Sequence, residues 1–416
     1  MGQITPHSEV IMESVGEVLA SKILIIVQNL PVPFDRRVWL EARTLTEAGY
    51  KVSIICPKGQ HGKYQEKHEY LEDIHIYRYP PPPEAHGFLG YAVEFIYCWL
   101  MTAFLSLKVW HEHNFDVIHA CNPPETYFLL ALVYKLFGKK FIFDHHDLSP
   151  EMFLAKGGRK AGMLYRGLLL LEKLTFKTAD VVITTNESHK QIAIARGNVH
   201  EEKIFIVRTG PDYERLKQLP PEPELKDGFP FLVCYLGEMC PQDGVDYVLK
   251  SAELISSKYK RTDIKFVLMG GGPSLAELRQ MSQKMGLEKV VEFTGRVSDY
   301  DLCRYLSTAD LCLDPDPFTE WSDRSTMNKI MEYMVFAKPI VAFDLTENRF
   351  SAQEAAVYAQ NNNIEEFSRL IIDLLDNESL RNEMGEFGQT RVKEKLVWDY
   401  SKPYLREAYA KALNIG

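Results

Sequence analysis

Residues 325–334 group polar side chains that could bind an anion and a hydroxyl group. Within this segment, STMNKIMEYM, Asn328 and Glu332 lie one helical turn apart, and Lys329 is beside them. The opposite face has the three- and four-residue spacing of a buried helix and consists of Met327, Ile330, Met331, Met334 and Val335. A helix start attracts anions, a lysine adds positive charge, and a carboxylate accepts hydrogen bonds from hydroxyls. The alternative is a surface ion pair between Lys329 and Glu332.

The loop before this helix offers several capping residues. We expect Ser322, Asp323 or Ser325 to accept a hydrogen bond from the first turn and so begin the helix. The β-branched residues after Pro339 predict the next strand. The segment therefore has the order loop, helix, strand.

Two neighbouring motifs allow a binding or a purely structural interpretation. Gly270, Gly271 and Gly272 follow a predicted strand and precede a helix, so their backbone could approach a ligand closely or form a tight turn. The DPD sequence at 314–316 has two carboxylates that could bind a metal ion. Because it ends a strand next to prolines, we interpret it as a turn and predict no metal site.

The end of the predicted strand 140–146 carries candidates for proton transfer or hydrogen bonding to a substrate. His146 is its last residue, and Asp147 follows. A histidine titrates near neutral pH and can donate or accept a proton, although a structural histidine is the alternative. His145 alternates to the other face of the strand. His119, near the end of an earlier strand, is a further candidate.

Arg36 and Arg37 lie after the first predicted strand, residues 23–27. They could bind a phosphate or an acceptor molecule, because a guanidinium matches such groups with two hydrogen bonds. A salt-bridged helix start is the alternative. No G-x-G-x-x-G fingerprint follows this strand, which argues against a dinucleotide-dependent dehydrogenase.

The composition excludes several classes of protein. A hydrophobic content of 46% and an aromatic content of 12% exclude a disordered chain, and 416 residues fit two domains. The net charge of −9 argues against nucleic-acid binding. The seven cysteines are scattered without a C-x-x-C pair, which indicates reduced thiols and a cytoplasmic protein. No secretory signal is visible in the first twenty residues.

The apolar segment 87–110 is long enough to span a membrane. Glu94 interrupts it, and a spanning helix would split an otherwise cytoplasmic domain. We therefore expect a mostly buried helix that also touches the membrane surface. The basic residues of segment 156–166 could dock on anionic lipid or form a solvated face. Together these segments predict peripheral contact with the inner face of the cytoplasmic membrane.

Short apolar strands alternate with helical patterns in both halves of the chain, as in buried parallel sheets. We expect strands at 23–27, 51–56, 116–120, 140–146, 180–185, 203–208, 231–237, 264–270, 290–295, 310–315 and 339–343. The pattern predicts an α/β protein with two Rossmann-like, doubly wound domains facing a central cleft. The first spans residues 21–211 and the second 212–395, after a tail at 1–20. Ligands would bind at the carboxyl ends of the strands.

Six local sequences, in order along the chain, resemble the family 4 glycosyltransferases, retaining enzymes of the GT-B fold. They are PFDRRVWLEARTL (33–45), HACNPPETY (119–127), FDHHDLSPE (143–151), TTNES (184–188), PQDGVDY (241–247) and STMNKIMEYM (325–334). The likeness runs from about Lys22 to the C-terminus and is to bacterial members that assemble polysaccharide or O-antigen. The last segment, 396–416, resembles the family's C-terminal helices that cross back onto the first domain.

The resemblance implies a nucleotide-sugar site around residues 325–334. In the family, the N-terminus of this helix faces the nucleotide diphosphate, and a glutamate within it binds the ribose, a role that falls to Glu332. Lys329 would add positive charge. The sugar-phosphate region would be lined by Ser325, Thr326 and Asn328. The family's strand-end histidine corresponds to His146, which would hydrogen-bond a hydroxyl of the donor sugar and the leaving diphosphate.

Two departures from the family pattern concern charge. The family has a second glutamate eight positions before the ribose glutamate; that position is Arg324 here, and Asp323 is one residue away. The family's usual arginine and lysine after the first strand of the second domain have no counterpart in residues 237–244. The charge of a diphosphate would then be offset by Arg324, Lys329 or Arg208.

We therefore predict an enzyme that moves a sugar from a nucleotide donor, expected to be UDP-linked, to a glycan or polyprenyl-linked acceptor in polysaccharide biosynthesis. The family's retaining mechanism is a same-face substitution assisted by the leaving phosphate. It requires no cofactor or metal, because helix N-termini and basic side chains offset the charge of the leaving group. A sugar-nucleotide epimerase on the same scaffold and an inactive scaffold in a polysaccharide assembly complex are the alternatives.

Overall fold

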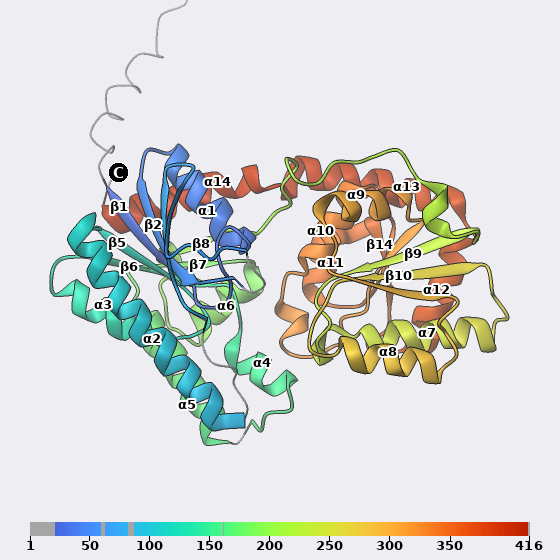
Figure 1. The fold of residues 1–416 in the computed structure, drawn as a ribbon, viewed down its shortest axis with the longest axis horizontal. Coiled ribbons are helices and arrows are strands. Elements are labelled where there is room, and N and C mark those ends of the chain that lie inside the picture. Colours follow the sequence, from blue (N-terminus) through green and yellow to red (C-terminus); the bar gives the residue numbers. More distant parts are fainter. Residues whose placement is uncertain (1–20, 60–62, 82–86, 161, 415–416) are drawn as a thin grey trace, which may run out of the picture. The chain divides into compact units, whose positions relative to one another are not determined.

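The computed structural model describes residues 21–59, 63–81, 87–160 and 162–414 of the chain. They form two compact units, each built around one largely parallel sheet (Figure 1). Unit 1 takes its described residues from 1–150, 159–207 and 401–416, and unit 2 consists of 151–158 and 208–400. The predicted tail at 1–20 lies outside the described residues. Two Rossmann-like units confirm the predicted fold class.

The sheet of unit 1 has the strand order β3-β4-β2-β1-β5-β6-β7-β8. Its strands are β1 (Lys22–Ile26), β2 (Lys51–Pro57), β3 (His68–Leu71), β4 (Ile74–Tyr79), β5 (Val117–Cys121), β6 (Lys140–His145), β7 (Val181–Thr184) and β8 (Ile204–Ile206). All neighbouring pairs are parallel except β3 and β4, which are antiparallel. The carboxyl ends of β1, β5, β6 and β7 therefore lie along one edge of the sheet.

Helices cover both faces of this sheet (Figure 1). They are α1 (Arg36–Glu47), α2 (Gly87–Glu112), α3 (Phe128–Lys135), α5 (Met163–Thr178), α6 (Glu187–Ala195) and most of α14 (Trp398–Leu413). A further helix, α4 (Ser149–Ala155), lies where the chain first enters unit 2. The last helix joins unit 1 by a buried stripe at helical spacing. This stripe consists of Leu405, Ala408, Tyr409 and Ala412.

The sheet of unit 2 is entirely parallel, with the strand order β11-β10-β9-β12-β13-β14. Its strands are β9 (Phe231–Leu236), β10 (Ile264–Met269), β11 (Val291–Gly295), β12 (Leu311–Asp314), β13 (Ile340–Phe343) and β14 (Ala356–Ala359). Its helices are α7 (Val245–Ser257), α8 (Leu275–Lys284), α9 (Asp299–Thr308), α10 (Asn328–Val335), α11 (Thr346–Ala352), α12 (Ile364–Leu375) and α13 (Glu378–Arg391).

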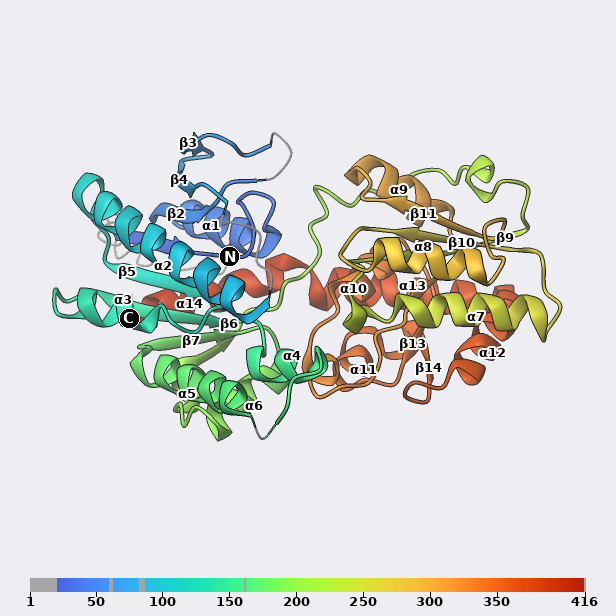
Figure 2. The same cartoon turned by 60° about the horizontal axis from the view of Figure 1, so that its bottom comes forward.

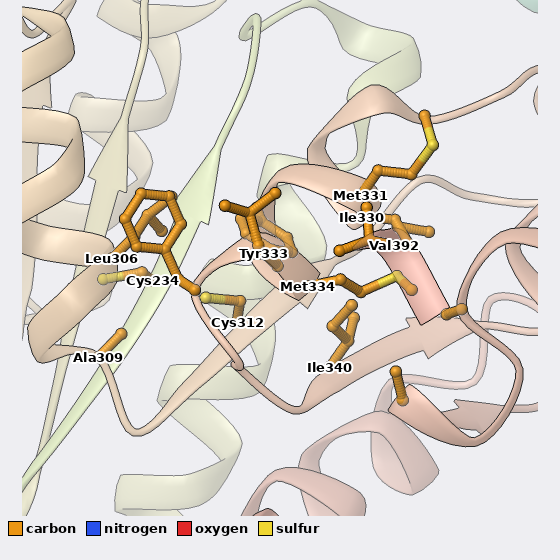
Figure 3. Packing of buried hydrophobic residues seen from close by; sticks show 14 of the residues in the cluster. Cys234, Leu306, Ala309, Cys312, Ile330, Met331, Tyr333, Met334, Ile340 and Val392 are labelled. Carbon is orange, nitrogen blue, oxygen red and sulfur yellow. The ribbon is translucent and has the colours of Figure 1, made fainter. Parts of the chain in front are cut away.

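Alternation along the strands of unit 2 sorts its core into two layers. Cys312 belongs to the cluster on one face of the sheet, whereas Leu311 and Leu313 belong to the cluster on the other. Figure 3 shows side chains of α10, among them Ile330 and Met334, gathered with Cys312 in the first cluster. The apolar stripe predicted for α10 is thus confirmed, and the exposed residue of this helix is Asn328 at its start.

The apolar segment 87–110 forms α2, and its predicted burial is wrong. By length and composition, Val93–Glu112 could cross a membrane, yet only 28% of its apolar window is buried inside the protein. The reason is that α2 is apolar on two sides. One side packs on the sheet, and the other faces outward.

Candidate active site

The end of β6 places three titratable side chains on two sides of the strand. Asp144 and His146 lie on one side, and His145 lies on the other, as alternation requires. Asp144 and His145 are fully buried, whereas the side chain of His146 is 17% exposed. The Oδ1 atom of Asn122 accepts hydrogen bonds from the backbone N–H groups of His146 (2.9 Å) and Asp147 (3.1 Å). This contact fixes the turn that presents the imidazole of His146.

Asp144 controls the charge of His146. The Nδ1 atom of His146 lies 3.0 Å from Oδ2 of Asp144. Burial alone would lower the pKa of His146, but the charge of Asp144 outweighs burial and raises this pKa to about 9. The ring is therefore an imidazolium at neutral pH. In that form it can donate a hydrogen bond or a proton to an anionic group.

Arg37 does not face solvent, and its guanidinium keeps Asp144 ionised. Its Nε and Nη2 atoms donate to the two carboxylate oxygens of Asp144 at 2.8 and 2.7 Å, and Nη1 donates to the carbonyl of Val207 at 2.8 Å. Burial would raise the pKa of Asp144, but Arg37 and then His146 hold it well below its ordinary value. The expected acceptor contact does not fit this buried guanidinium. Arg36, the preceding residue, is exposed and remains an acceptor-side candidate.

His119 is also part of the core and does not fit the acceptor role predicted for it. Its ring is fully buried, and Nδ1 lies 2.7 Å from the hydroxyl of Tyr409 on α14. Its Nε2 atom lies 3.6 Å from Glu41. Burial raises the pKa of Glu41 to about 7, although Arg37 opposes the shift. His119 therefore ties α14 to the centre of unit 1.

Four buried side chains around Arg37 could be read as a metal site. Their ligand atoms lie within 4.8 Å of one another, and they belong to Glu41, His119, Cys121 and Asp144. However, the guanidinium of Arg37 lies 3.1 Å from Glu41 and 2.7 Å from Asp144. A cation already neutralises these carboxylates, so the cluster is an ion-pair network of the protein itself.

His145 is fully buried among other side chains of unit 1. Its Nε2 atom lies 3.3 Å from Oε1 of Glu172, and its ring packs against Phe176 and His189. Arg196 pairs with the same glutamate. His145 is therefore a core residue between β6 and α5, and His146 is the histidine of this pair that can reach a bound molecule.

In unit 2, the start of α10 lacks the cap predicted for it. Its N-cap residue is Met327, which makes no side-chain capping hydrogen bond. Ser325 donates instead to the carbonyl of Trp321 at 2.7 Å. Asp323 accepts from the backbone N–H of Thr346 at 2.8 Å and so supports the start of α11. The first turn of α10 thus keeps the positive end of its dipole without a carboxylate or hydroxyl of its own cap.

Glu332, one turn into α10, forms an ion pair with Arg215 instead of Lys329. Arg215 also donates to Asp299 at 2.9 Å, and these contacts orient the glutamate. The carboxylate of Glu332 is mostly buried. A buried carboxylate held by a cation is rigid, which suits recognition of a specific pair of hydroxyls.

Lys329 is engaged by the DPD turn. Its Nζ atom lies 3.1 Å from Asp314 and also contacts Asp316. Both carboxylates are fully buried, and burial raises the pKa of Asp316 well above its ordinary value against the attraction of Lys329. The positive charge of Lys329 is therefore already offset within the protein. To neutralise a diphosphate, it would have to share or exchange these partners.

Arg208 reaches the loop that precedes α10. It donates to the hydroxyl of Thr326 at 3.0 Å and to Glu347 at 3.2 Å. Its guanidinium lies 4.4 Å from the ring centroid of Phe350. Arg324 is more exposed and lies 3.7 Å from Glu151, while Asn328 is exposed at the helix start. These donor-site candidates thus lie before and at the N-terminus of α10.

The glycines after β10 are needed for packing between loops. A Cβ atom on Gly270, whose φ is +145°, would lie 1.8 Å from the carbonyl oxygen of Gly237. A Cβ on Gly272 would lie 2.6 Å from the carbonyl oxygen of Met239. Gly271 has no such backbone conflict, since its nearest neighbour is the side chain of Arg296. Of the donor candidates Gly271 and Gly272, the second has a structural reason to be glycine.

Three residues of these sites were not predicted. Asp144 stands two positions before His146, so strand alternation alone would have placed both on one side. Asn122 follows the neighbouring strand β5, where polar strand-end residues are expected to meet those of β6. Arg215 lies in a loop far from Glu332 in sequence, and no local pattern identifies it.

Comparison with known families finds two that match successive parts of the chain. The family described as "Glycosyltransferase Family 4" matches residues 35–215, and the one described as "Glycosyl transferases group 1" matches residues 230–377. An uncharacterised glycosyltransferase of Methanocaldococcus jannaschii is 22% identical over 379 residues, covering 88% of this chain and 92% of the relative. The O-antigen chain mannosyltransferase C of Escherichia coli is 26% identical over 154 residues, covering 36% of this chain and 40% of the relative.

Solved structures show the same fold. Sucrose-phosphate synthase from Thermosynechococcus elongatus superposes with a TM-score of 0.76 at 15% identity, covering 95% of this chain and all of the other. HepE of Anabaena, solved in complex with UDP, superposes with a TM-score of 0.69 at 16% identity, covering 94% of this chain and 99% of the other. At such identities the likeness establishes the architecture of the two units.

Proposed function

Because this chain is a glycosyltransferase with the GT-B fold, we propose that it transfers a sugar from a UDP-sugar to a glycan or polyprenyl-linked acceptor in polysaccharide biosynthesis. The observation that carries the proposal is the uncapped start of α10 with Glu332 one turn inside the helix. Backbone N–H groups and the helix dipole favour a diphosphate, and a rigid carboxylate accepts hydrogen bonds from the two ribose hydroxyls. The UDP complex of HepE supports the choice of nucleotide.

Residues before and at the start of α10 complete the proposed donor site. Thr326, Ser325 and Asn328 line the sugar-phosphate region, and Arg208 and Arg324 supply positive charge near it. Lys329 contributes by exchanging part of its contact with Asp314 and Asp316 for a phosphate oxygen. Such exchange is feasible because Asp316 has a raised pKa and can take up a proton.

His146 is the proposed catalytic residue. Its imidazolium donates a hydrogen bond to the departing diphosphate or orients a hydroxyl of the donor sugar. Asp147, the next residue, adds to the negative field that keeps His146 protonated. Stabilising charge that develops on a leaving group lowers the barrier more than it strengthens ground-state binding. The acceptor then attacks the face from which the diphosphate leaves, which retains the configuration of the sugar.

Replacing Glu332 with glutamine should weaken binding of UDP by about 1.5–3 kcal/mol, the range for hydrogen bonds to a charged group. The variant keeps the shape of the side chain but loses the charged carboxylate, whose two oxygens are proposed to accept hydrogen bonds from the ribose hydroxyls. Titration calorimetry with UDP measures the loss.

The matched control is Asp299→Asn, which removes the other carboxylate partner of Arg215. It should bind UDP nearly as well as the wild type. Equal losses in Glu332→Gln and Asp299→Asn would show that the effect comes through Arg215, and Glu332 would then be a structural residue.

Product analysis separates the three candidate functions. With a UDP-sugar and an acceptor extract, a glycosyltransferase releases UDP and labels the acceptor. Conversion of the nucleotide sugar to its epimer without release of UDP would identify an epimerase. If the protein bound neither donor nor acceptor, it would be an inactive scaffold of a polysaccharide assembly complex.

Treatment with EDTA should leave the rate of transfer unchanged. The carboxylates of the DPD turn already contact Lys329, and the proposed leaving group is neutralised by a helix start and basic side chains. The test compares rates before chelation, after it, and after addition of Mg²⁺ or Mn²⁺. A loss that either ion restores would contradict the proposed charge compensation.

A further inference from the structure

The outer side of α2 is an apolar stripe. Large side chains recur on it at three- and four-residue spacing, and each is more than half exposed: Val93, Ile96, Leu100, Phe104 and Leu107. The opposite side of the helix is buried and includes Cys98, Thr102, Leu105, Ser106 and Val109. A helix on the surface of a water-soluble domain ordinarily exposes polar residues at these outward positions.

The stripe continues across two further helices. On α3 and just after it, the exposed apolar residues are Leu129, Leu132, Val133, Leu136 and Phe137, and on α5 they are Met163, Leu164 and Leu170. Among the residues that the structure describes, more than half of the exposed large apolar side chains belong to these three helices or directly follow α3. We call this set the apolar face. Ordinary protein surfaces expose large apolar side chains singly, whereas these are gathered on three helices.

Contacts between the helices show that the three parts of the apolar face lie on neighbouring elements. Ser106 on α2 lies 2.9 Å from the hydroxyl of Tyr134 on α3, and Trp110 packs against Phe137 with ring centroids 4.8 Å apart. Helix α3 in turn contacts α5. Figures 1 and 2 both show α2, α3 and α5 on the same side of the sheet of unit 1.

A basic stripe runs beside the apolar face on α5. Arg166, Lys173 and Lys177 are exposed and lie at positions i, i+7 and i+11, which fall on one side of a helix. Met163 and Leu170 occupy the adjoining stripe. The acidic residue of this helix, Glu172, is fully buried and paired with Arg196. The exposed charge of α5 is thus positive in a chain whose net charge is −9.

We propose that the apolar face of α2, α3 and α5 docks on the surface of a membrane that contains anionic lipids. The apolar side chains enter the boundary between headgroups and acyl chains, and the basic stripe contacts the headgroups. Helix α2 lies along the membrane without spanning it, because its other side is held by β2 and α3. This goes beyond the proposed function, although it places the enzyme where a polyprenyl-linked acceptor would be.

Charge favours a membrane over a second copy of the chain as the occupant of this face. A symmetric dimer presents the same patch on both subunits, so one interface would enclose the basic stripes of both. Like charges that meet in an interface cost free energy. Anionic headgroups instead offer the opposite charge to the same stripe.

Flotation of the full chain with vesicles tests the proposal. The wild type should float with vesicles of phosphatidylcholine and phosphatidylglycerol, and less with phosphatidylcholine alone. The variant Leu100→Gln/Phe104→Gln/Leu136→Gln should bind at least about tenfold more weakly because it loses apolar insertion. The variant Arg166→Gln/Lys173→Gln/Lys177→Gln should lose most of the preference for anionic vesicles, at low salt above all.

The control variant is Tyr300→Gln/Tyr404→Gln, which removes exposed aromatic residues outside the apolar face and should bind like the wild type. Circular dichroism confirms that each variant is folded. The proposal would be overturned by no flotation of the wild type, by unchanged binding of both test variants, or by a wild-type dimer that Leu100→Gln/Phe104→Gln/Leu136→Gln dissociates. Retention of the protein in membranes at alkaline pH would show instead that α2 spans them.

Discussion

Replacing His146 with alanine should lower kcat at least about tenfold, equivalent to 1.4 kcal/mol. The expected change in the KM for the donor is smaller. The imidazolium of His146, paired with Asp144 at 3.0 Å, is proposed to stabilise negative charge on the departing diphosphate. An interaction that strengthens as the bond breaks affects kcat more than ground-state binding. Initial rates at several donor concentrations measure both constants.

The pH dependence of the rate provides an independent test of the same role. His146 acts in its protonated form, and its pKa of about 9 means that this form is lost as the pH rises through 9. The rate of the wild type should therefore fall on the alkaline side of the profile. The variant His146→Gln should be slow and should lack this fall.

His145→Ala is the matched control, since it changes the neighbouring residue on the other side of β6. It removes a core contact with Glu172 and Phe176, so it should reduce stability more than it reduces the rate of the folded enzyme. If His146→Ala were fully active while a folded His145→Ala were inactive, the catalytic role would belong to His145 and the proposal for His146 would be wrong.

Replacing Arg37 with methionine should reduce the free energy of unfolding by about 3–5 kcal/mol, the typical cost of removing one partner of a buried ion pair. Asp144, which is fully buried, would lose two hydrogen bonds and its strongest cationic partner, and the imidazolium of His146 at 3.0 Å would be left to offset its charge. Urea denaturation of the wild type and the variant measures the difference.

Two companion variants interpret this result. Arg36→Met changes the exposed neighbour and should alter stability by less than about 0.5 kcal/mol. The double variant Arg37→Met/Asp144→Leu removes both charges and should be more stable than Arg37→Met alone by at least about 1 kcal/mol. If the double variant were less stable than Arg37→Met, the inference that Arg37 stabilises the protein by pairing with Asp144 would be wrong.

Much of the fold was predictable because buried parallel strands are short apolar runs with clear ends. The predicted strand 140–146 corresponds to β6 at Lys140–His145, and 264–270 corresponds to β10 at Ile264–Met269. Strands β3, β4 and the four-residue β14 were not predicted. In β3, exposed and half-buried residues alternate, and β4 carries His75 and Arg78, so neither is a plain apolar run. The extent of the outward face of α2 was underestimated because apolar residues on both sides of a helix mimic a buried one.

The positions of the candidate site residues were predictable from the sequence, but the residues that pair with them were not. The strand-end position of His146 and the exposed start of α10 follow from local patterns. The ion pairs of Glu332 with Arg215 and of Lys329 with Asp314 join positions that are remote or on different elements. Local spacing suggested instead a pair between Lys329 and Glu332. Charge partners are decided by three-dimensional packing, which a single sequence does not display.

The position of α14 in unit 1 has a consequence for how the chain is made. Tyr409 fills a buried place beside His119 and Tyr50, yet it is synthesised after all of unit 2. During synthesis, unit 2 can complete its core while unit 1 still exposes the surface that α14 will cover. A stop codon shortly before Ser401 would therefore leave the later unit folded and the earlier one open to aggregation and proteolysis. For this chain, the order of synthesis is the reverse of the order in which the units mature.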